Sequence, residues 1–308
     1  MTGARVLVTG AAGFLGRHLC PRLRAAGAEV HAVSRQRARG HAAADRWWTA
    51  DVADEAAARE LVHAVKPDVV IHLSALTHAA PGLDLVLPTF RSALSSTVNL
   101  LAALTQHGCR RIVLTGSMEE PLGDGAVVRP ASPYAAAKWA ASAYGRMFHA
   151  LYGAPVVIAR LTLTYGPGQL ERKVIPSTIL ALLRGKRPRV SSGTRAWDVL
   201  YVEDAVEALV ALAEGRGPDG ATLEIGTGRL VSLHAVVERL VAMIDPTIVP
   251  AFGEVPDRPL TESRAADAAA TAEMLGWRAT TSLEAGLQRT VDWYRARLHP
   301  ADNHGVVT

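Results

Sequence analysis

Three residues near the middle of the chain could together deliver a proton to an oxygen atom. Tyr134 and Lys138 stand four residues apart in SPYAAAK, so on a helix both side chains point the same way. A neighbouring ammonium favours the phenolate and lowers the pKa of a tyrosine from about 10, which makes the phenol a usable acid near neutral pH. Ser117, in LTGSMEE, stands at the predicted carboxyl end of a strand, where its hydroxyl could hold the same oxygen. The set predicts proton transfer to a developing alkoxide.

A glycine-rich turn near the N-terminus is the second chemical feature. Gly10, Gly13 and Gly16 follow an apolar run and precede a predicted helix, with Phe14 and Leu15 in its first turn. Glycine permits positive φ, close approach of backbone N–H groups to a pyrophosphate, and close packing of helix on strand. The helix N-terminus adds partial positive charge. The pattern predicts a bound dinucleotide, the alternative being a plain tight turn.

The end of the second predicted strand bears on which dinucleotide is bound. NAD is usually recognised there by an acidic residue that binds the ribose 2′-hydroxyl. This chain has Ser34 and Arg35 instead, with Arg37 and Arg39 beyond them. A hydroxyl and a guanidinium suit a 2′-phosphate, because arginine binds phosphate through two parallel hydrogen bonds. We therefore predict NADPH (NADP) as the cofactor; the alternative is that these arginines form a solvated loop.

The elements that must position these residues alternate along the first half of the chain. Apolar runs without polar alternation indicate strands buried on both faces. They lie at 5–9, 29–33, 68–73, 111–115 and 155–160. Helical patterns lie between them at 14–26, 54–65, 89–107 and 132–152. This alternation predicts an α/β fold, a Rossmann doubly wound parallel sheet.

The pattern changes after the turn-rich YGPGQ at 165–169. Helical patterns follow at 174–184, 203–214, 232–243 and 282–298, with short strands such as 222–225. We expect residues 1–165 to form the NADP-binding Rossmann domain, with segments of the C-terminal half returning to it. Residues 166–308 are expected mainly to form a smaller C-terminal α/β substrate-binding cap.

The composition argues against several classes of protein. With 308 residues, 49% hydrophobic and 20% charged, the chain is typical of a soluble globular protein. The net charge is only +4 and the arginines are dispersed, so we expect no nucleic-acid partner. No apolar run approaches about 18 residues and the first strand begins near residue 5, so we expect no membrane span, no signal peptide and a cytoplasmic protein. Cys20 and Cys109 lack metal-ligand spacing, so no metal is expected.

These motifs together resemble the extended short-chain dehydrogenase/reductase family, the sugar-nucleotide epimerases and dehydratases. The likeness covers nearly the whole chain. It includes TGAAGFLG, DVAD at 51–54, VVIHLSA at 69–75, TVNLL at 97–101, GSMEE, SPYAAAK, YGPGQ, DVLYVEDAVEAL at 198–209 and LGW at 275–277.

The resemblance implies roles for further residues. Asp51 and Val52 would flank the adenine, and the ribose on the nicotinamide side would be lined by Leu73, Ser74 and Ala75. Tyr134 and Lys138 would also border the cofactor, Lys138 holding the nicotinamide ribose, and Asn99 would brace the active-site strand. The family further implies a homodimer built through the helices near 89–107 and 132–152.

Departures from the family pattern distinguish its branches. Dehydratases resemble one another in carrying Thr-Asp-Glu where this chain has Ser117-Met118-Glu119, and Met118 cannot act as an acid. Epimerases keep NAD bound and usually have an acidic residue where this chain has Ser34-Arg35. GSMEE is similar to the GSxEEYG of reductases acting on nucleotide-linked 4-keto-6-deoxyhexoses, with Pro121 in place of tyrosine. Glu119 would either contact the substrate or tune Tyr134, or else face water.

The family's contacts to the substrate diphosphate are kept only in part. Leu163 stands where asparagine is usual, and in WDV, which replaces RDF, the nearest guanidinium is Arg195. Arg258 matches a position where an arginine meets the diphosphate. A pocket lined by Leu163 and Trp197 would instead fit a polycyclic or polyketide ketone.

We therefore predict an NADPH-dependent ketoreductase that reduces the keto group of a nucleoside diphosphate 4-keto-6-deoxyhexose, in deoxysugar and natural-product biosynthesis such as that of antibiotics. One alternative is an NAD-retaining sugar-nucleotide epimerase. Another is an NADPH reductase of a non-nucleotide polycyclic or polyketide ketone. A non-catalytic NADP-sensing protein is the third, and the intact set of Ser117, Tyr134 and Lys138 argues against it.

Overall fold

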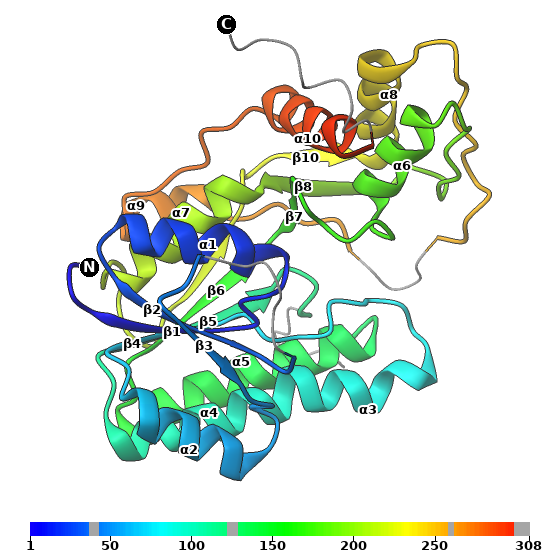
Figure 1. The fold of residues 1–308 in the computed structure, drawn as a ribbon. Helices are drawn as coiled ribbons and strands as arrows, with labels where there is room; N and C mark the ends of the chain where they lie inside the picture. The colour runs from blue at the N-terminus through cyan, green and yellow to red at the C-terminus, as the bar shows by residue number, and fades with distance from the viewer. Residues whose placement is uncertain (37–42, 122–128, 258–261, 299–308) are drawn as a thin grey trace, which may run out of the picture.

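Two sheets organise the protein in a computed structural model that describes residues 1–36, 43–121, 129–257 and 262–298 (Figure 1). The strands of the larger sheet are β1 (Arg5–Thr9), β2 (Glu29–Ser34), β3 (Arg46–Thr49), β4 (Val69–His72), β5 (Arg111–Ser117), β6 (Val156–Leu161) and β9 (Thr222–Ile225). Their order across the sheet is β3-β2-β1-β4-β5-β6-β9, and every pairing is parallel. The direction in which strands are added reverses between β1 and β4, and it is at such a point that doubly wound sheets bind ligands.

Helices cover both faces of this sheet (Figure 1). One face carries α2 (Glu55–Val65), α4 (Ser96–His107) and α5 (Pro133–Tyr152). The other carries α1 (Phe14–Ala25), α7 (Val202–Ala213) and α9 (Ala268–Leu275). The predicted Rossmann α/β fold is therefore confirmed.

The smaller sheet belongs to the C-terminal half of the chain. Its strands are β7 (Leu163–Tyr165), β8 (Ala196–Tyr201) and β10 (Leu230–Ser232), in the order β10-β8-β7. It shares an apolar core with α6 (Val174–Leu183), α8 (Leu233–Ile244) and α10 (Leu283–Leu298). Among the described residues, no helix combines the length and apolar character needed to cross a bilayer.

Several elements differ from the sequence-based expectations, among them α9, β8 and β10, which were not predicted. β3 was not predicted, because a short edge strand with partly exposed side chains lacks the apolar run of a buried strand. The helix expected at 89–107 is divided into α3 (Val86–Thr89), a π-helix (Phe90–Ser95) and α4. β9 was expected among the strands of the cap, but it pairs with β6 in the larger sheet.

Local chemistry fixes where α5 begins and ends, and α5 supplies two of the predicted site residues. The side chain of Ser132 accepts a hydrogen bond from the Ala135 N–H at 3.1 Å, and Pro133 occupies the first helical position. Gly153 ends the helix in the left-handed conformation, with φ of 65°. The start of α5 was therefore predictable from SPYAAAK alone.

The buried carboxylate of Asp198 fastens the cap strand β8 to two other segments. Its Oδ1 accepts hydrogen bonds from the Thr227 N–H at 2.9 Å and the Thr227 hydroxyl at 2.6 Å. Its Oδ2 accepts from Gly228 N–H at 2.9 Å and Ala266 N–H at 3.1 Å. One side chain thus joins β8 to the segment after β9 and to the segment before α9.

Asp198→Asn should lower the free energy of unfolding by about 2–3 kcal/mol, because the new amide turns a donor toward N–H groups that then lack an acceptor. Urea unfolding would measure the loss. Asp292→Asn is the matched control, because Asp292 is exposed on α10 and its described partners, Gln288 and Arg295, belong to the same helix; its effect should stay below about 0.5 kcal/mol. Equal effects of the two substitutions would contradict this account of Asp198.

Candidate active site

The structure brings Ser117, Tyr134 and Lys138 together at the carboxyl end of β5. Ser117 is the last residue of β5, and the other two lie in the first two turns of α5. Ser117 and Lys138 are buried, being 7% and 4% exposed, and the side chain of Ser117 faces the phenol of Tyr134. The predicted constellation therefore exists as one cluster.

The pKa of Tyr134 lies above its ordinary value, so the expectation that Lys138 lowers it is wrong for this structure. Burial is the largest cause, and the carboxylates of Glu119 and then Glu120 add to it because negative charge disfavours the phenolate. Only the side chain of Ser117 acts in the opposite direction. Tyr134 is consequently a protonated phenol at neutral pH, which is the form that can donate a proton.

The ammonium of Lys138 is held by the strand beside it. Its Nζ donates to the carbonyl oxygen of Thr115 at 2.7 Å. Burial lowers the pKa of Lys138 to about 8, while the carboxylate of Glu120 acts in the opposite direction. Lys138 is therefore a buried cation whose charge can change just above neutral pH.

His72 lies beneath this cluster and was not among the predicted site residues. Its Nδ1 is 2.7 Å from Thr9 Oγ1 and its Nε2 is 3.1 Å from Thr97 Oγ1, so it connects β4 to β1 and α4. Burial, with a contribution from Lys138, lowers its pKa to about 3, and the imidazole is neutral. The only sequence signal was a histidine that ends the buried run VVIH.

The glycine-rich turn has the geometry of a close backbone approach. Gly10 has φ of +67°, and a Cβ there would lie 3.0 Å from the backbone atoms Leu73 C and Ser74 N. A Cβ on Gly16 would collide with the backbone of Ala11. Gly13 is the N-cap of α1 and has no side chain to cap the first-turn N–H groups. The turn thus lies against Leu73 and Ser74, and no side chain caps the start of α1, where a pyrophosphate would accept hydrogen bonds from the first-turn N–H groups.

Residues predicted around the adenine lie between β3 and α2. Val52 is buried, and Asp51 Oδ1 accepts a hydrogen bond from the Ala53 N–H at 3.1 Å. Asn99 donates to the carbonyl oxygen of Val52 at 3.3 Å. The expectation that Asn99 braces the active-site strand is therefore wrong, since its described hydrogen bond steadies the Asp51–Val52 loop instead.

The residues predicted to recognise the 2′-phosphate lie at the carboxyl end of β2. The Ser34 hydroxyl donates to the carbonyl of Gln36, and Arg35 is exposed. Arg37 and Arg39 lie outside the described residues. Ala75, predicted near the nicotinamide, follows Leu73 and Ser74 at the end of β4 and is partly buried.

The predicted substrate residues are spread over several segments. Glu119 lies two residues after Ser117, and its N–H donates to the Ser117 hydroxyl at 3.1 Å. Arg195 stacks on Trp197 at 5.8 Å, and Trp197, like Leu163, packs against the apolar core of the smaller sheet. Arg258 lies outside the described residues. Glu119 is thus the predicted substrate residue that the structure places beside Tyr134.

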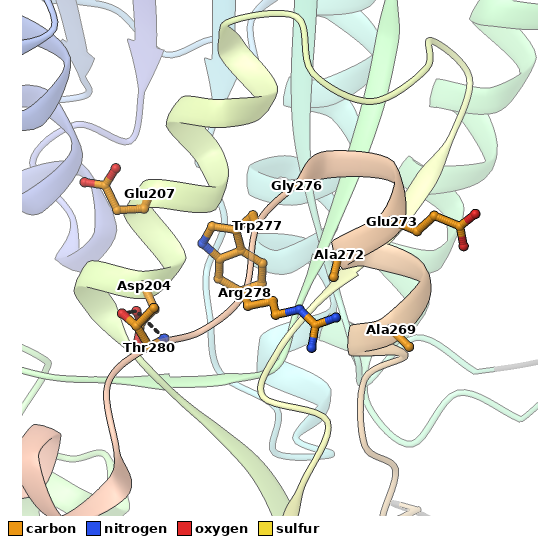
Figure 2. A pocket seen from close by; sticks show the side chains of 9 residues that line it. All are labelled: Asp204, Glu207, Ala269, Ala272, Glu273, Gly276, Trp277, Arg278 and Thr280. Atoms are coloured by element: carbon orange, nitrogen blue, oxygen red, sulfur yellow. Dashed lines mark hydrogen bonds between the residues drawn. The ribbon is translucent and has the colours of Figure 1, made fainter.

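A surface hollow of about 760 Å³ lies between α7 and α9 (Figure 2). It shares no lining residue with the cluster at β5. Its walls include Asp204, Glu207, Glu273 and Trp277, and none of the predicted site residues. The Asp204 carboxylate accepts hydrogen bonds from Thr280 N–H and hydroxyl, so it fastens the chain after α9. The hollow offers no chemistry comparable with the cluster at β5.

The chain is similar to known proteins along most of its length. The sequence model described as "NAD dependent epimerase/dehydratase family" matches residues 6–226. The chain is 31% identical to a probable dTDP-glucose 4,6-dehydratase of Sinorhizobium fredii, over 94% of this chain and 92% of that protein. It is also 31% identical to a UDP-glucose 4-epimerase of Mycolicibacterium smegmatis, over 94% and 98% of the two chains. The solved structure of MoeE5 with UDP-glucuronic acid and NAD is 31% identical, covers 95% of this chain and 99% of its own, and superposes with a TM-score of 0.84.

The burial of neutral His72 predicts a specific acid sensitivity. Between the folded pKa of about 3 and the ordinary value of 6.5, the unfolded chain binds a proton that the folded protein excludes. The contribution of His72 to stability is therefore complete above about pH 6.5 and is lost as pH falls toward 3. In His72→Gln, urea unfolding free energy should fall less steeply across this window than in the wild type. The exposed His63→Gln is the control; a wild-type slope in His72→Gln would contradict the assignment.

Proposed function

The chain belongs to the NAD dependent epimerase/dehydratase family, and within that family we propose that it is an NADPH-dependent ketoreductase acting on a nucleoside diphosphate 4-keto-6-deoxyhexose. The observation that carries the proposal is the cluster in which Ser117 faces a protonated Tyr134 beside buried Lys138. The smaller sheet with α6, α8 and α10 is proposed as the substrate-binding cap.

Each residue of the cluster has a separate role in the proposed reduction of a ketone to a secondary alcohol. When bound, NADPH supplies the hydride that is added to the carbonyl carbon. Ser117 holds the carbonyl oxygen through its hydroxyl, and Tyr134 gives the proton that the oxygen needs as its charge develops. Lys138 keeps positive charge next to the site below about pH 8, and that charge would favour the alkoxide as it develops on the substrate oxygen.

The glycine turn fits a bound dinucleotide for two reasons. A Cβ on Gly10 would occupy the space between the turn and the end of β4, and no side chain caps the N-terminus of α1, where a pyrophosphate would bind. Arg35 favours NADPH over NADH, since it is exposed at the carboxyl end of β2, where a 2′-phosphate would lie. A cofactor recognised by its phosphate and consumed at each turnover suits a reductase, which must exchange it.

Met118 supports reduction over 4,6-dehydration. Its sulfur accepts a hydrogen bond from Arg264 Nη2 at 3.1 Å, and a thioether has no proton to give. Reduction needs only the three residues of the cluster, whereas the dehydratase-like pattern has an aspartic acid at this position.

A sugar-nucleotide epimerase is the second candidate. It is favoured by the 31% identity to the UDP-glucose 4-epimerase of Mycolicibacterium smegmatis and to MoeE5, whose structure holds NAD. An epimerase returns its hydride and keeps its NAD, so the purified protein would release stoichiometric NAD on denaturation. The proposed reductase would instead exchange its cofactor with the medium.

We also propose a homodimer formed through α3, the π-helix and α5. This face exposes large apolar side chains, among them Leu87 at 71% and Phe90 at 49%. Trp139 and Tyr144 of α5 are 38% and 41% exposed, and α5 packs beside the π-helix. Covering such a face with a second copy of the chain would remove these groups from water.

Tyr134→Phe should reduce kcat by about 10²–10⁴-fold, because the ring remains while the proton donor is lost. NADPH affinity, measured by fluorescence titration, should stay within about two-fold of the wild type. Tyr144→Phe, on an exposed part of the same helix, is the matched control and should retain full activity. If Tyr134→Phe keeps most of its activity, the proton donor lies elsewhere.

Arg35→Asp should reduce the preference for NADPH over NADH by roughly 10- to 100-fold, since a phosphate partner is replaced by a repelling charge. The ratio of kcat/KM for the two cofactors measures this preference. Arg46→Asp, at the opposite end of the neighbouring edge strand β3, should leave the ratio unchanged. An unaltered ratio in Arg35→Asp would refute the cofactor assignment.

A further inference from the structure

A buried carboxylate lies directly behind Ser117. The side chain of Glu120 has no exposed surface. Its Oε1 accepts a hydrogen bond from the Ser117 N–H at 2.7 Å, and its Oε2 accepts from Arg160 Nη2 at 3.2 Å. A Cβ on Gly116 would lie 2.6 Å from Glu120 Oε1, so the glycine makes room for the carboxylate. Both oxygens of Glu120 are thus fixed in place.

A series of charged side chains, those of Arg160, Glu224 and Arg264, extends from this carboxylate across the neighbouring strands. Arg160 Nη1 donates to Glu224 Oε1 at 3.5 Å, and Arg264 Nη2 lies 3.1 Å from the same oxygen. Arg264 Nη2 also donates to Met118 Sδ at 3.1 Å, which returns the series to the residue after Ser117. The two carboxylates and the two guanidinium groups therefore balance in charge. Of the four side chains, Glu120 is the one that contacts Ser117.

We propose that Glu120 is a positioning residue of the active site: its carboxylate fixes Ser117 at the end of β5 and supplies the negative charge that Tyr134 and Lys138 face. Its catalytic consequence rests on the function proposed above. Its placement rests on the contacts of Glu120 with Ser117 and Arg160, which do not depend on which reaction the cluster performs.

The charges around the cluster show what this carboxylate does electrostatically. Tyr134 faces Glu119 and Glu120, and Lys138 faces Glu120 together with the neutral His72 of β4. Arg160 of β6, and behind it Glu224 of β9 and Arg264, complete the set of ions. Negative charge at Glu120 favours the ammonium of Lys138 and the neutral phenol of Tyr134. Both are the protonated forms from which delivery of a proton starts.

The electrostatic role can be tested without turnover, because the chain has only four lysines: Lys66, Lys138, Lys173 and Lys186. NMR of lysine labelled with ¹³C at Cε would follow the titration of each, with Lys138→Met to assign one resonance. The titration midpoint of Lys138, near pH 8 in the wild type, should move downward in Glu120→Gln. It should stay in place in Glu224→Gln, a control that disturbs the same ions without touching Ser117, Tyr134 or Lys138.

The positioning role is tested by kinetics on the same variants. Glu120→Gln should lower kcat by on the order of 10-fold or more and change KM for NADPH little, because Ser117 and not the cofactor turn is displaced. If Glu120→Gln does not fold, Glu120→Asp serves instead: it keeps the charge but shortens the reach to the Ser117 N–H. The shorter variant should keep the Lys138 midpoint and still lose kcat.

Three results would overturn the proposal. The first is an unmoved Lys138 midpoint in Glu120→Gln, and the second is a midpoint that moves equally in Glu224→Gln. The third is a wild-type kcat in Glu120→Asp. Failure of the proposed function has a different signature: wild-type protein that consumes no NADPH while the Lys138 midpoint still responds to Glu120→Gln alone.

Discussion

The site depends on how the polar end of one completely buried strand is satisfied. All of β5 is buried, so the backbone groups at its carboxyl end need partners within the protein. The Lys138 ammonium donates to the Thr115 carbonyl, and the Glu120 carboxylate accepts from the Ser117 N–H. The Thr115 hydroxyl donates to the His72 carbonyl at 2.8 Å. Each bond that stabilises the strand also sets the place of a group that could take part in catalysis.

Burial then determines the charge of these groups. The phenol of Tyr134 stays neutral because it is buried and faces carboxylates, and the imidazole of His72 stays neutral because β1, β4 and α4 enclose it. Lys138 is the group whose charge changes near physiological pH, and Glu120 favours its charged form. In the proposed reaction, this arrangement would keep the proton donor protonated and place a cation beside the oxygen that receives the proton.

The sequence predicted well what short motifs determine. The glycine turn, the capped start of α5 and the apolar strands each follow from a few neighbouring residues, and the structure has them where expected. The cluster of Ser117, Tyr134 and Lys138 was predictable because the carboxyl end of a parallel strand and the next helix start lie close together in this fold.

The sequence could not predict what tertiary packing decides. The edge strand β3 has no buried run to mark it, and only the folded sheet shows that β9 returns to β6. The effect of Lys138 on Tyr134 was predicted wrongly, because the burial of the phenol and the two carboxylates near it cannot be read from a four-residue spacing. Glu120 and Arg160 are 40 residues apart, so their pairing is likewise visible only in the structure.

If the protein consumes NADPH to reduce a ketone, the stoichiometry of cofactor to product tests this most directly. Purified protein would be mixed with NADPH and a TDP-4-keto-6-deoxyglucose-type substrate, and the absorbance of the reduced nicotinamide followed alongside product. The account predicts one equivalent of NADPH consumed for each alcohol formed. An isomerised product with no net consumption of NADPH would contradict it and favour the epimerase.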